Sequence, residues 1–376
     1  FKEDKMQKGN VSKNIGKRLR EARLLAGISQ ERIARELKIS RSRYSDIENG
    51  KKRISVDELY RFADFFGRPL DFFLKSESLA EESFRVLCRS VSNDLELSKT
   101  VSKFEKLCTN LAQLQRLLNI SPTELESQDY EYSLQNTRFQ AKAYAERERR
   151  LLGLGDEPVK NLAEVLMEKR GIKVFVLPLP EEISGMFTYG KDMGGCILVN
   201  QRHPSGRQLF SLAHEYGHYL FHKNKIALVD YLHGKSNRDE KLVDTFAAEF
   251  LMPETAVRKS FYSWIGTSST VSAGDILHIC DYFGTSFEAM LNRLRGLRLI
   301  SEKERQKLKD ETWISRTRQI MGIPEPPKME GKFPRYYKIL CLKAFMKDKI
   351  TVSKLADILE IPLYQAMELA RNLTSV

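Results

Sequence analysis

Hydrophobic and polar positions follow short helical periods near the start of the chain. Residues 14–74 predict five short helices separated by Gly, Ser and Pro, and Ser29, Ser40 and Ser55 stand where the second, third and fourth would begin. A serine at such a position accepts a hydrogen bond from the first helical turn, and Ser55 with Glu58 forms a capping box. The segment therefore predicts a compact, all-helical module.

A longer helix is predicted within residues 79–118, which are polar on one side. Apolar side chains recur there at steps of four and three residues, the spacing of one helical stripe: Leu97, Val101, Phe104, Cys108 and Leu111. Such a stripe either docks on a neighbouring domain or pairs with a second chain, and docking is the commoner outcome. Polar residues 121–135 follow and predict a linker.

The pattern changes in the middle of the chain. Helical periods over residues 139–152 and 159–169 are followed by three short apolar runs between Gly and Pro residues, at 172–177, 183–187 and 196–199. These runs predict a small sheet that ends in a hairpin. Two further helices are predicted from Pro204 to about His222 and from about Glu240 to Leu251, so this region is α+β.

Short helices are predicted over residues 254–300, and a small helical unit, about residues 336–372, closes the chain. Pro324, Pro326 and Pro327 lie between them in a charged connector. We find no internal repeat of long period. The expected fold is multidomain and mostly α, with an all-α domain, a helical linker, an α+β domain, and a connector with a small helical unit: residues 1–75, 76–135, 136–300 and 301–376.

Composition narrows the class of protein. With 41% hydrophobic and 30% charged residues, and no apolar run long enough for a membrane helix, the chain is expected to be soluble, with no membrane partner. Its charged first dozen residues lack the apolar core of a secretory signal, and its five cysteines never form a C-x-x-C pair. We therefore expect a reducing compartment, the cytoplasm.

Positive charge is concentrated near the N-terminus. The chain has a net charge of +12, and residues 1–75, with 19 Lys and Arg against 11 Asp and Glu, account for +8 of it. This concentration favours a polyanionic partner for the first domain, most often nucleic acid, over a merely solvated basic face.

The run "GISQERIARELKISRSRYSDIENGKKRIS" has the order of elements that helix-turn-helix recognition needs: a bracing helix, a tight turn and a helix whose polar side chains enter the major groove. The expected inner face and turn comprise Ile33, Ala34, Leu37, Ile39, Tyr44 and Ile47. That arrangement leaves the polar side chains of the second helix outside: Arg41, Ser42, Ser45 and Asp46.

Over residues 14–74 the sequence resembles the XRE-type helix-turn-helix family, most specifically in "SQERIA" and "IENGKK". The resemblance implies a double-stranded DNA operator and, because one module covers a half-site, a homodimer. It implies that phosphates are held by Gln30, Asn49, Lys51 and Lys52, and that base edges are faced by Arg41, Ser42 and Asp46. The alternative is that Gln30 only starts a helix and Asn49 only ends one. Tyr44 stands where a smaller aliphatic residue is usual.

The run "SLAHEYGHYLFH" contains H-E-x-x-H within a predicted helix. His214 and His218 lie one turn apart, so both imidazoles can bind Zn²⁺, with Mn²⁺ as the alternative ion, while Glu215 would deprotonate the metal-bound water and pass its proton to the leaving amine. His222 lies about 12 Å along the helix from His214, too far to share one ion. We expect His222 to orient another residue or to serve in packing.

A third protein ligand is expected on the following helix. Glu240 and Asp244 stand four residues apart, so Glu240 can bind the metal while Asp244 accepts a hydrogen bond from a histidine ligand. Asp239 and Glu249 are substitutes for Glu240.

From about residue 140 to 300 the chain resembles the ImmA/IrrE metallopeptidase family. The matching runs are "LGLGDEPVKNLAEVLMEKRGI", "ISGMF", "LVNQRHPSGRQLFSLAHEYGHYLFH" and "DTFAAEFLMP". The resemblance implies a thermolysin-like fold with a Glu-x-x-x-Asp helix, and an endopeptidase that cleaves transcriptional repressors. Val243 stands where the family commonly has Ala.

Peptide hydrolysis also needs an edge strand for the substrate and a donor for the oxyanion. The run "GGCILVN" is the expected edge strand, and Tyr216, Tyr219 and His233 are candidate donors, each more commonly structural. The predicted function is a DNA-binding regulator whose zinc endopeptidase cleaves a repressor, either this chain or a partner. The alternatives are a regulator that uses the fold as a sensor or scaffold without proteolysis, and an antitoxin-like or phage-related regulator.

Overall fold

The computed structural model describes residues 12–20, 22–23, 29–66, 70–74, 95–120, 130, 136–190, 193–222, 237–266, 270–309, 314–323, 328–329 and 333–374. The chain divides into two compact units. The first contains the described residues up to 74 and the second contains those from 95 onward. Each unit has its own core, and each is described by itself.

The first unit is all-helical, as predicted. Residues 12–20 and 22–23 are helical and are followed by α2 (Gln30–Glu36), α3 (Arg41–Glu48), α4 (Val56–Phe65) and α5 (Leu70–Leu74). Ser29, Ser40 and Ser55 cap α2, α3 and α4 with their side chains, which confirms the predicted helix starts. The core includes every predicted inner residue of the two central helices, and Ile39 packs against it from the turn.

Tyr44 fits this core despite its size. Its ring is fully buried and lies 5.6 Å from the ring of Phe62 of α4, measured between centroids. The hydroxyl donates to the carbonyl oxygen of Leu19 at 3.5 Å, so the polar end of the side chain has a partner. Burial raises the pKa of Tyr44 well above its usual range.

The second unit contains a three-stranded sheet formed by β1 (Lys173–Leu177), β2 (Gly185–Gly190) and β3 (Gly194–Asn200). The order is β1-β3-β2, with β1 parallel and β2 antiparallel to β3, so the predicted hairpin is confirmed. The expectation that "GGCILVN" forms an edge strand is wrong, because β3 is the central strand. Its continuous apolar run, Cys196–Val199, is fully buried, as is typical of a strand with a neighbour on each side. Among the described residues, β2 lies at one edge.

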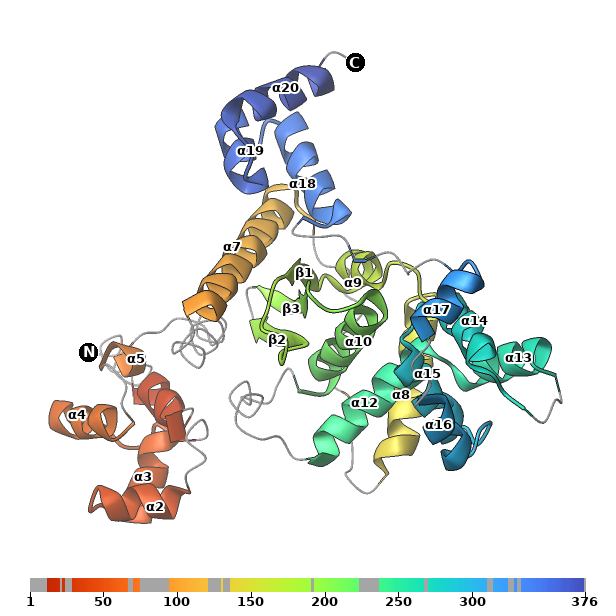
Figure 1. The fold of residues 1–376 in the computed structure, drawn as a ribbon. Coiled ribbons are helices and arrows are strands. Elements are labelled where there is room, and N and C mark those ends of the chain that lie inside the picture. Colours follow the sequence, from red (N-terminus) through yellow and green to blue (C-terminus); the bar gives the residue numbers. More distant parts are fainter. Residues whose placement is uncertain are drawn as a thin grey trace. The chain divides into compact units, whose positions relative to one another are not determined.

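Two helices carry the residues of the predicted metal centre (Figure 1). Helix α10 (Ser205–His222) packs on β2 and β3, and α12 (Asn237–Leu251) packs on both α10 and α8 (Thr137–Leu151). Helix α12 begins three residues before the predicted start at Glu240. A further helix, α9 (Leu162–Arg170), contacts β1 and α10. The sheet and α8 therefore hold the two helices from opposite sides.

Helix α7 (Leu95–Leu117) docks within its own unit. Its whole apolar stripe is buried, and Phe104 packs edge-on against Phe175 of β1, with ring centroids 6.2 Å apart. Helix α18 (Arg335–Met346) contacts α7 as well, and Figure 1 shows the two helices meeting. The stripe therefore has a partner inside the chain, which confirms the docking prediction for the described residues.

The remaining elements of the second unit are also helices. They are α13 (Glu254–Trp264), α14 (Ala273–Phe283), α15 (Phe287–Gly296), α16 (Glu302–Lys309), α17 (Ile314–Ile320), α19 (Val352–Leu359) and α20 (Leu363–Thr374). The predicted class, mostly α with a small α+β middle region, is confirmed. The linker 121–135, apart from Tyr130, and the prolines at 324, 326 and 327 lie outside the described residues. Across the part of the chain that is described, no helix is long and apolar enough to cross a membrane.

Candidate functional site

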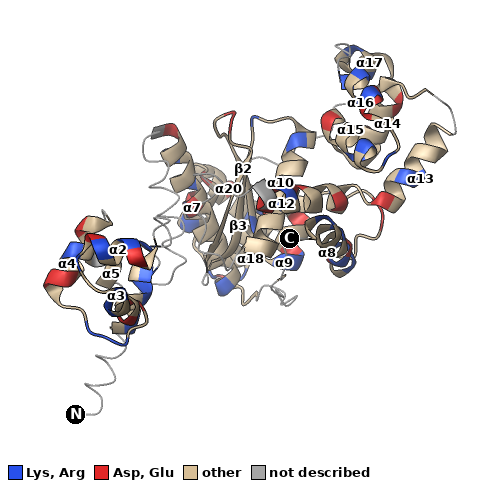
Figure 2. Cartoon of the chain, turned by 90° about the horizontal axis from the view of Figure 1, so that it is seen from below, with Lys and Arg blue, Asp and Glu red and all other residues tan. Residues whose placement is uncertain are grey.

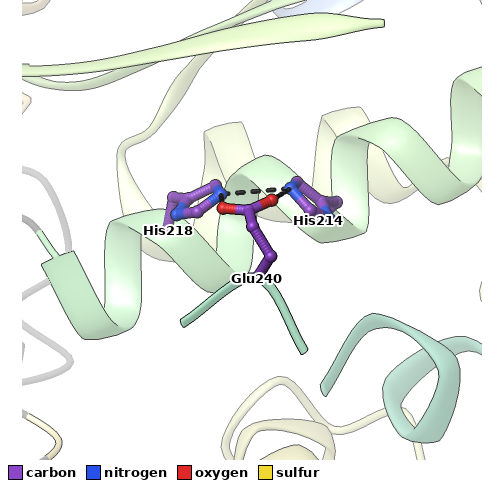
Figure 3. Close-up of side chains that lie close together, drawn as sticks. All are labelled: His214, His218 and Glu240. Atoms are coloured by element: carbon purple, nitrogen blue, oxygen red, sulfur yellow. Dashed lines mark hydrogen bonds and ion pairs between the residues drawn. The ribbon is translucent and has the colours of Figure 1, made fainter. Parts of the chain in front are cut away.

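The metal centre begins with two histidines on α10. Helical spacing puts His214 and His218 on the same face, and their Nε2 atoms lie 3.0 Å apart (Figure 3). Both side chains are largely shielded from solvent, with 15% and 4% of their surface exposed. Two ring nitrogens thus point at one small volume, as ligands of a single ion do.

Glu240 of α12 closes this volume from the other side. Its Oε2 lies 3.4 Å from His214 Nε2 and its Oε1 lies 3.5 Å from His218 Nε2. The three donor atoms all lie within 4.8 Å of one another. Bonds of 2.0–2.1 Å at tetrahedral angles would separate the ligand atoms of Zn²⁺ by about 3.3 Å, so these residues fit a zinc ion with one position left open.

Asp244 orients the first histidine. Its Oδ1 lies 2.8 Å from His214 Nδ1, so Nδ1 donates to Asp244 while Nε2 faces Glu240. Burial alone would lower the pKa of His214, but its hydrogen bonds with Asp244 and Glu240 raise that pKa to about 9. A cation is therefore favoured at this position, whether it is a proton or a metal ion.

His222 contacts the second histidine. Its Nδ1 lies 2.7 Å from His218 Nδ1, and its Nε2 lies 3.9 Å from Asp239 Oδ1. If His218 Nε2 binds a metal, its Nδ1 must carry a proton, and His222 Nδ1 is then the acceptor. His222 and Asp239 thus stand beside the three-donor cluster and not within it.

Glu215 is 1% exposed and lies under the start of β2. A Cβ at Gly185 would stand 3.1 Å from its Cγ and 3.2 Å from its Oε1, so only glycine leaves the carboxylate this room. Gly185 was not singled out from the sequence, although it lies in the "ISGMF" run. Because β2 is an edge strand, this contact places the carboxylate beside backbone that is free to pair with a peptide on its outer side, as far as the described residues extend.

Several residues considered from the sequence are held elsewhere. Both carboxylate oxygens of Glu249 accept from Arg293, at 2.6 and 2.5 Å, so Glu249 does not serve as a substitute ligand. The hydroxyl of Tyr216 donates to Glu148 and accepts from Arg170 Nε at 3.0 Å, which makes it a structural residue. Tyr219 packs against Phe187 and Tyr189 of β2, and His233 lies outside the described residues.

The buried acceptor Glu148 was not predicted. It is fully buried, and it accepts hydrogen bonds from Arg170 and from the hydroxyls of Tyr130 and Tyr216. Tyr216 follows Glu215 directly on α10, so the cluster fixes the rotation of the helix that carries the metal ligands. Arg170, Tyr130 and Tyr216 lie 22, 18 and 68 residues from Glu148 along the chain. No local sequence pattern reveals contacts over such separations.

The candidate DNA interface lies on α3 and the turn after it. Arg41 and Ser42 are exposed, whereas Ser45 and Asp46 are half-buried. The Nε of Arg41 lies 2.7 Å from Glu31 Oε1 at the surface, and Asn49 Nδ2 donates to the carbonyl oxygen of Ser45 at 2.8 Å. Lys51 and Lys52 are exposed, and Figure 2 shows basic positions on the helices of this unit.

Gln30 has an intramolecular partner that the sequence did not indicate. Its Nε2 donates to Glu48 Oε2 at 2.7 Å, while Glu48 Oε1 accepts from Arg23 Nε at 2.6 Å. The buried carboxylate of Glu48 thus connects α2, α3 and the first helix, and it directs the amide of Gln30.

Two segments of the chain match known family models. Residues 19–73 match the family model for Helix-turn-helix, and residues 167–295 match the model for the IrrE N-terminal-like domain of peptidase family M78. An "Uncharacterized transcriptional regulator in ATPase CF(0) region" of Rhodospirillum rubrum is 33% identical over 64 residues, which are 17% of this chain and 59% of that protein. This chain thus spans less than two thirds of that relative.

Two solved structures show weaker likenesses. A Mycobacterium tuberculosis transcriptional regulator is 17% identical with a TM-score of 0.31, over 50% of this chain and 51% of that one. ComR from Streptococcus suis is 12% identical with a TM-score of 0.16, over 96% and 92%. TM-scores this low do not define a common fold. By these matches, the chain contains a segment of the XRE-type helix-turn-helix kind, residues 19–73, and a segment of the IrrE N-terminal-like kind of peptidase family M78, residues 167–295.

Proposed function

We propose that the chain is a cytoplasmic transcriptional regulator that binds a double-stranded DNA operator as a homodimer and hydrolyses a peptide bond in a repressor. The convergence of His214, His218 and Glu240 carries the enzymatic part, because three donors within 4.8 Å leave room for one further ligand. A sensor that had lost catalysis would not need a buried glutamate beside these donors. The proposed metal is zinc, with manganese as the alternative.

Each residue has a distinct role in this proposal. His214, His218 and Glu240 hold the ion, which supplies Lewis-acid chemistry to activate a water and polarise the scissile carbonyl. Glu215 accepts a proton from the attacking water and delivers it to the leaving amine nitrogen. Asp244 and His222 are positioning residues: each contacts the Nδ1 of one histidine, at 2.8 and 2.7 Å, and keeps that Nε2 directed at the ion.

We propose that the substrate chain pairs with β2, in place of the β3 edge expected from the sequence. The edge position of β2 and the contact of Gly185 with Glu215 support this arrangement. An extended peptide added to the outer side of β2 would cross directly over the carboxylate. Its backbone would then be aligned by the strand, as peptide hydrolysis requires.

The test is intact-mass analysis of the purified chain after incubation with Zn²⁺ or Mn²⁺, alone and with candidate repressors. We expect metal-dependent fragments from one of these proteins, and none from Glu215→Gln, which retains the size and most hydrogen-bonding capacity of the side chain. Glu168→Gln, on α9 away from the cluster, is the matched control and should cleave like the wild type. A cut that Glu215→Gln also makes would assign the activity to a contaminating protease.

A cut in cis and a cut in trans have different consequences for DNA binding. Cleavage of this chain between its two units would detach the DNA-binding domain, so the chain mass and operator occupancy would fall together. Cleavage of a separate repressor would leave this chain intact, and its DNA-binding domain would only set its location. Following both quantities in one reaction separates the two cases.

A further inference from the structure

The C-terminal helices repeat the architecture of the DNA-binding module. Adding 322 to a residue number of the first unit gives the matching position: the N-cap Ser29 becomes the N-cap Thr351, and the α3 start Arg41 becomes the α20 start Leu363. Helix α19 therefore corresponds to α2, and α20 corresponds to α3. The helices from α18 to α20 therefore follow the register of the first unit, a likeness that recurring residues in the sequence do not reveal.

The turn between the helices is the same in both units. Lys38 and Glu360 are non-glycine residues in the left-handed region, with φ of 54° and 52°. The next residue is isoleucine in each unit, and its N–H donates to the carbonyl oxygen of the buried alanine five positions earlier, at 2.9 Å from Ile39 and 3.1 Å from Ile361. The same combination also follows α7, α15 and α18, at Asn119, Arg298 and Asp348, so it is a common way for a helix to end and does not by itself define a repeat.

The preceding helix extends the match. Ile15, Arg18, Leu19 and Ala22 form the buried face of the first helix, and their counterparts form that of α18: Tyr337, Leu340, Cys341 and Ala344. A similar left-handed turn at Gly284 joins α14 to α15, but there Trp264 stands at the position of Arg18 and is half-exposed. The register of the whole three-helix unit, and not the turn alone, therefore defines the repeat.

The outer face of α19 and α20 carries different types of residue from the outer face of α2 and α3. The eight positions expected to contact DNA in the first unit correspond in the second to Val352, Leu363, Tyr364, Met367, Glu368, Arg371, Leu373 and Thr374. Only one of these is a cation, and the pair Lys51 and Lys52 has no basic counterpart. A surface that binds phosphates needs such cations, so this face is unsuited to DNA.

The same face is apolar and accessible. Leu363, Tyr364 and Met367 are 50%, 67% and 47% exposed and lie on one side of α20. Together these three side chains expose roughly 300 Å² of mostly apolar surface, at the lower end of the range of the largest patches that monomers carry. A stable interface needs about 800 Å² per partner, of which somewhat more than half is apolar, so this patch has the size of the apolar centre of one modest interface.

We propose that α20 pairs with α20 of a second copy of this chain, so that the repeat is the dimerisation element of the protein. Two observations favour a second copy as the occupant. The α7 stripe, the other long apolar face, is already buried within the chain, although a helix-turn-helix reader needs two copies for its two half-sites. Glu368 and Arg371 carry opposite charges beside the patch, so a second copy of the helix would meet charges of both signs and not like charges alone.

This inference uses the proposed regulatory function only to explain why two copies are needed, and it is tested without DNA or metal. Sedimentation of the full-length chain, from about 1 to 100 µM, should show a reversible dimer. Met367→Glu should raise the dimer dissociation constant by at least about tenfold, because the two-fold axis brings two unpaired carboxylates into the interface. The matched control is Asn372→Glu, which adds the same charge to an exposed position on the polar side of α20 and should change the constant by less than about twofold.

The outcomes separate this proposal from its alternatives. Circular dichroism melting checks folding, and Tyr364→Lys replaces Met367→Glu if the latter melts early. A wild type that stays monomeric throughout the range overturns the proposal and assigns the face to another protein. A dimer that survives both variants overturns it as well. A failure of metal-dependent cleavage, by contrast, would leave the sedimentation result unchanged.

Discussion

The candidate metal site consists of three side chains of α10 and α12, and His218 is the most shielded of these donors. Its Nε2 lies 3.0 Å from His214 Nε2, so removing the ring leaves two protein ligands, too few to retain zinc. We expect the wild type to hold one zinc per chain and His218→Ala to hold none after dialysis, measured by inductively coupled plasma mass spectrometry. His278→Ala, whose ring stacks on Trp264 on α13, is the control and should retain the ion. Equal occupancy in wild type and His218→Ala would assign the metal to another site.

Single residues of the DNA-binding unit divide into two kinds. Arg41 is exposed at the start of α3, where a base edge would be reached, whereas Lys51 follows the helix and suits a phosphate. Arg41→Ala should therefore relax the base preference at one or two operator positions, at a cost of about 1–3 kcal/mol for the preferred sequence. Lys51→Ala should weaken binding to all DNA sequences evenly. It should also reduce the slope of log K against log salt concentration by about one. Titration of a duplex library at several salt concentrations distinguishes these effects, and identical behaviour of the two variants would contradict the assignment.

At the scale of elements, local sequence patterns predicted the helices, whereas the order of the strands depends on long-range pairing. The caps at Ser29, Ser40 and Ser55 and the span of α10 follow from residues within a few positions of each other. The order of the three strands does not, since the hydrogen bonding of β3 to both neighbours depends on pairings that sequence periodicity does not encode. The substrate edge was for this reason assigned to the wrong strand.

The same distinction holds for the candidate site. H-E-x-x-H and the spacing of Glu240 from Asp244 are local, and the structure brings these residues together. Glu249 lies on the same helix, α12, but it pairs with Arg293, 44 residues later, and not with the histidines. Gly185 is important for its closeness to Glu215, which only the packing of β2 on α10 creates.

Helix α10 approaches the α14–α15 turn so closely that Gly206 has no room for a side chain. A Cβ there would stand 2.5 Å from Ser286 N and 2.7 Å from the carbonyl carbon of Thr285, and backbone atoms cannot move aside as a flexible side chain can. Gly206→Ala should therefore lower the free energy of unfolding by about 1–3 kcal/mol. Gly296→Ala, at the end of α15 with nothing within 4 Å, should be neutral or stabilise by up to about 1 kcal/mol. Urea denaturation compares the two variants. Equal midpoints would argue against the close approach of α10 to the α14–α15 turn.

Helices α8 and α13 are joined by a small ion-pair cluster. Glu254 accepts from Lys142 at 2.6 Å and from Arg258 at 2.9 Å, and these hydrogen bonds lower the pKa of Glu254 to about 2. A carboxylate with a depressed pKa stabilises the fold above its ordinary pKa and loses that contribution as the pH falls from about 4.5 to about 2. At pH 7 we expect Glu254→Gln to cost less than about 1 kcal/mol, because all three side chains are partly exposed. The difference from wild type in unfolding free energy should vanish near pH 2, and a difference that persists there would indicate a packing effect instead.

For the whole molecule, the sequence predicted which domains follow one another along the chain. It did not predict what α7 packs against or what the C-terminal helices resemble. The stripe on α7 left docking and dimerisation both open, and the burial of Phe104 against β1 decides for docking. The C-terminal unit was predicted only as helical, because its likeness to the first unit rests on buried positions and a turn. Between α2 and α19, with their turns, only Ala34, Leu37 and Ile39 are identical to their counterparts. A repeat kept by packing and not by identity escapes a search for recurring residues.

We expect the two units to be coupled, so that a change at the metal centre alters operator binding, and the docking of α7 gives this coupling a physical route. Helix α7 is the first described element after Leu74, and its Phe104 is fully buried against the sheet that also supports α10, the helix of the two candidate metal-binding histidines. If a change at the metal centre alters operator affinity, it should pass through this contact, so Phe104→Ala should bring the ratio of DNA dissociation constants with and without metal closer to one. The loss of core packing, about 3–5 kcal/mol, is large enough to loosen α7.

Leu117→Ala provides the matched control, since Leu117 is on the same helix but 41% exposed, and its removal should leave the ratio unchanged. The measurement is fluorescence anisotropy with an operator selected from random duplexes, with chain mass followed in parallel so that binding changes due to cleavage are excluded. Each variant must keep its metal content, because an altered ratio could otherwise reflect a lost ion. A wild type whose affinity does not respond to metal, in a preparation that cuts a second protein, would refute coupling and favour cleavage in trans. If metal still changes DNA affinity in Phe104→Ala, the coupling does not pass through α7, because in that variant α7 no longer packs tightly on the sheet.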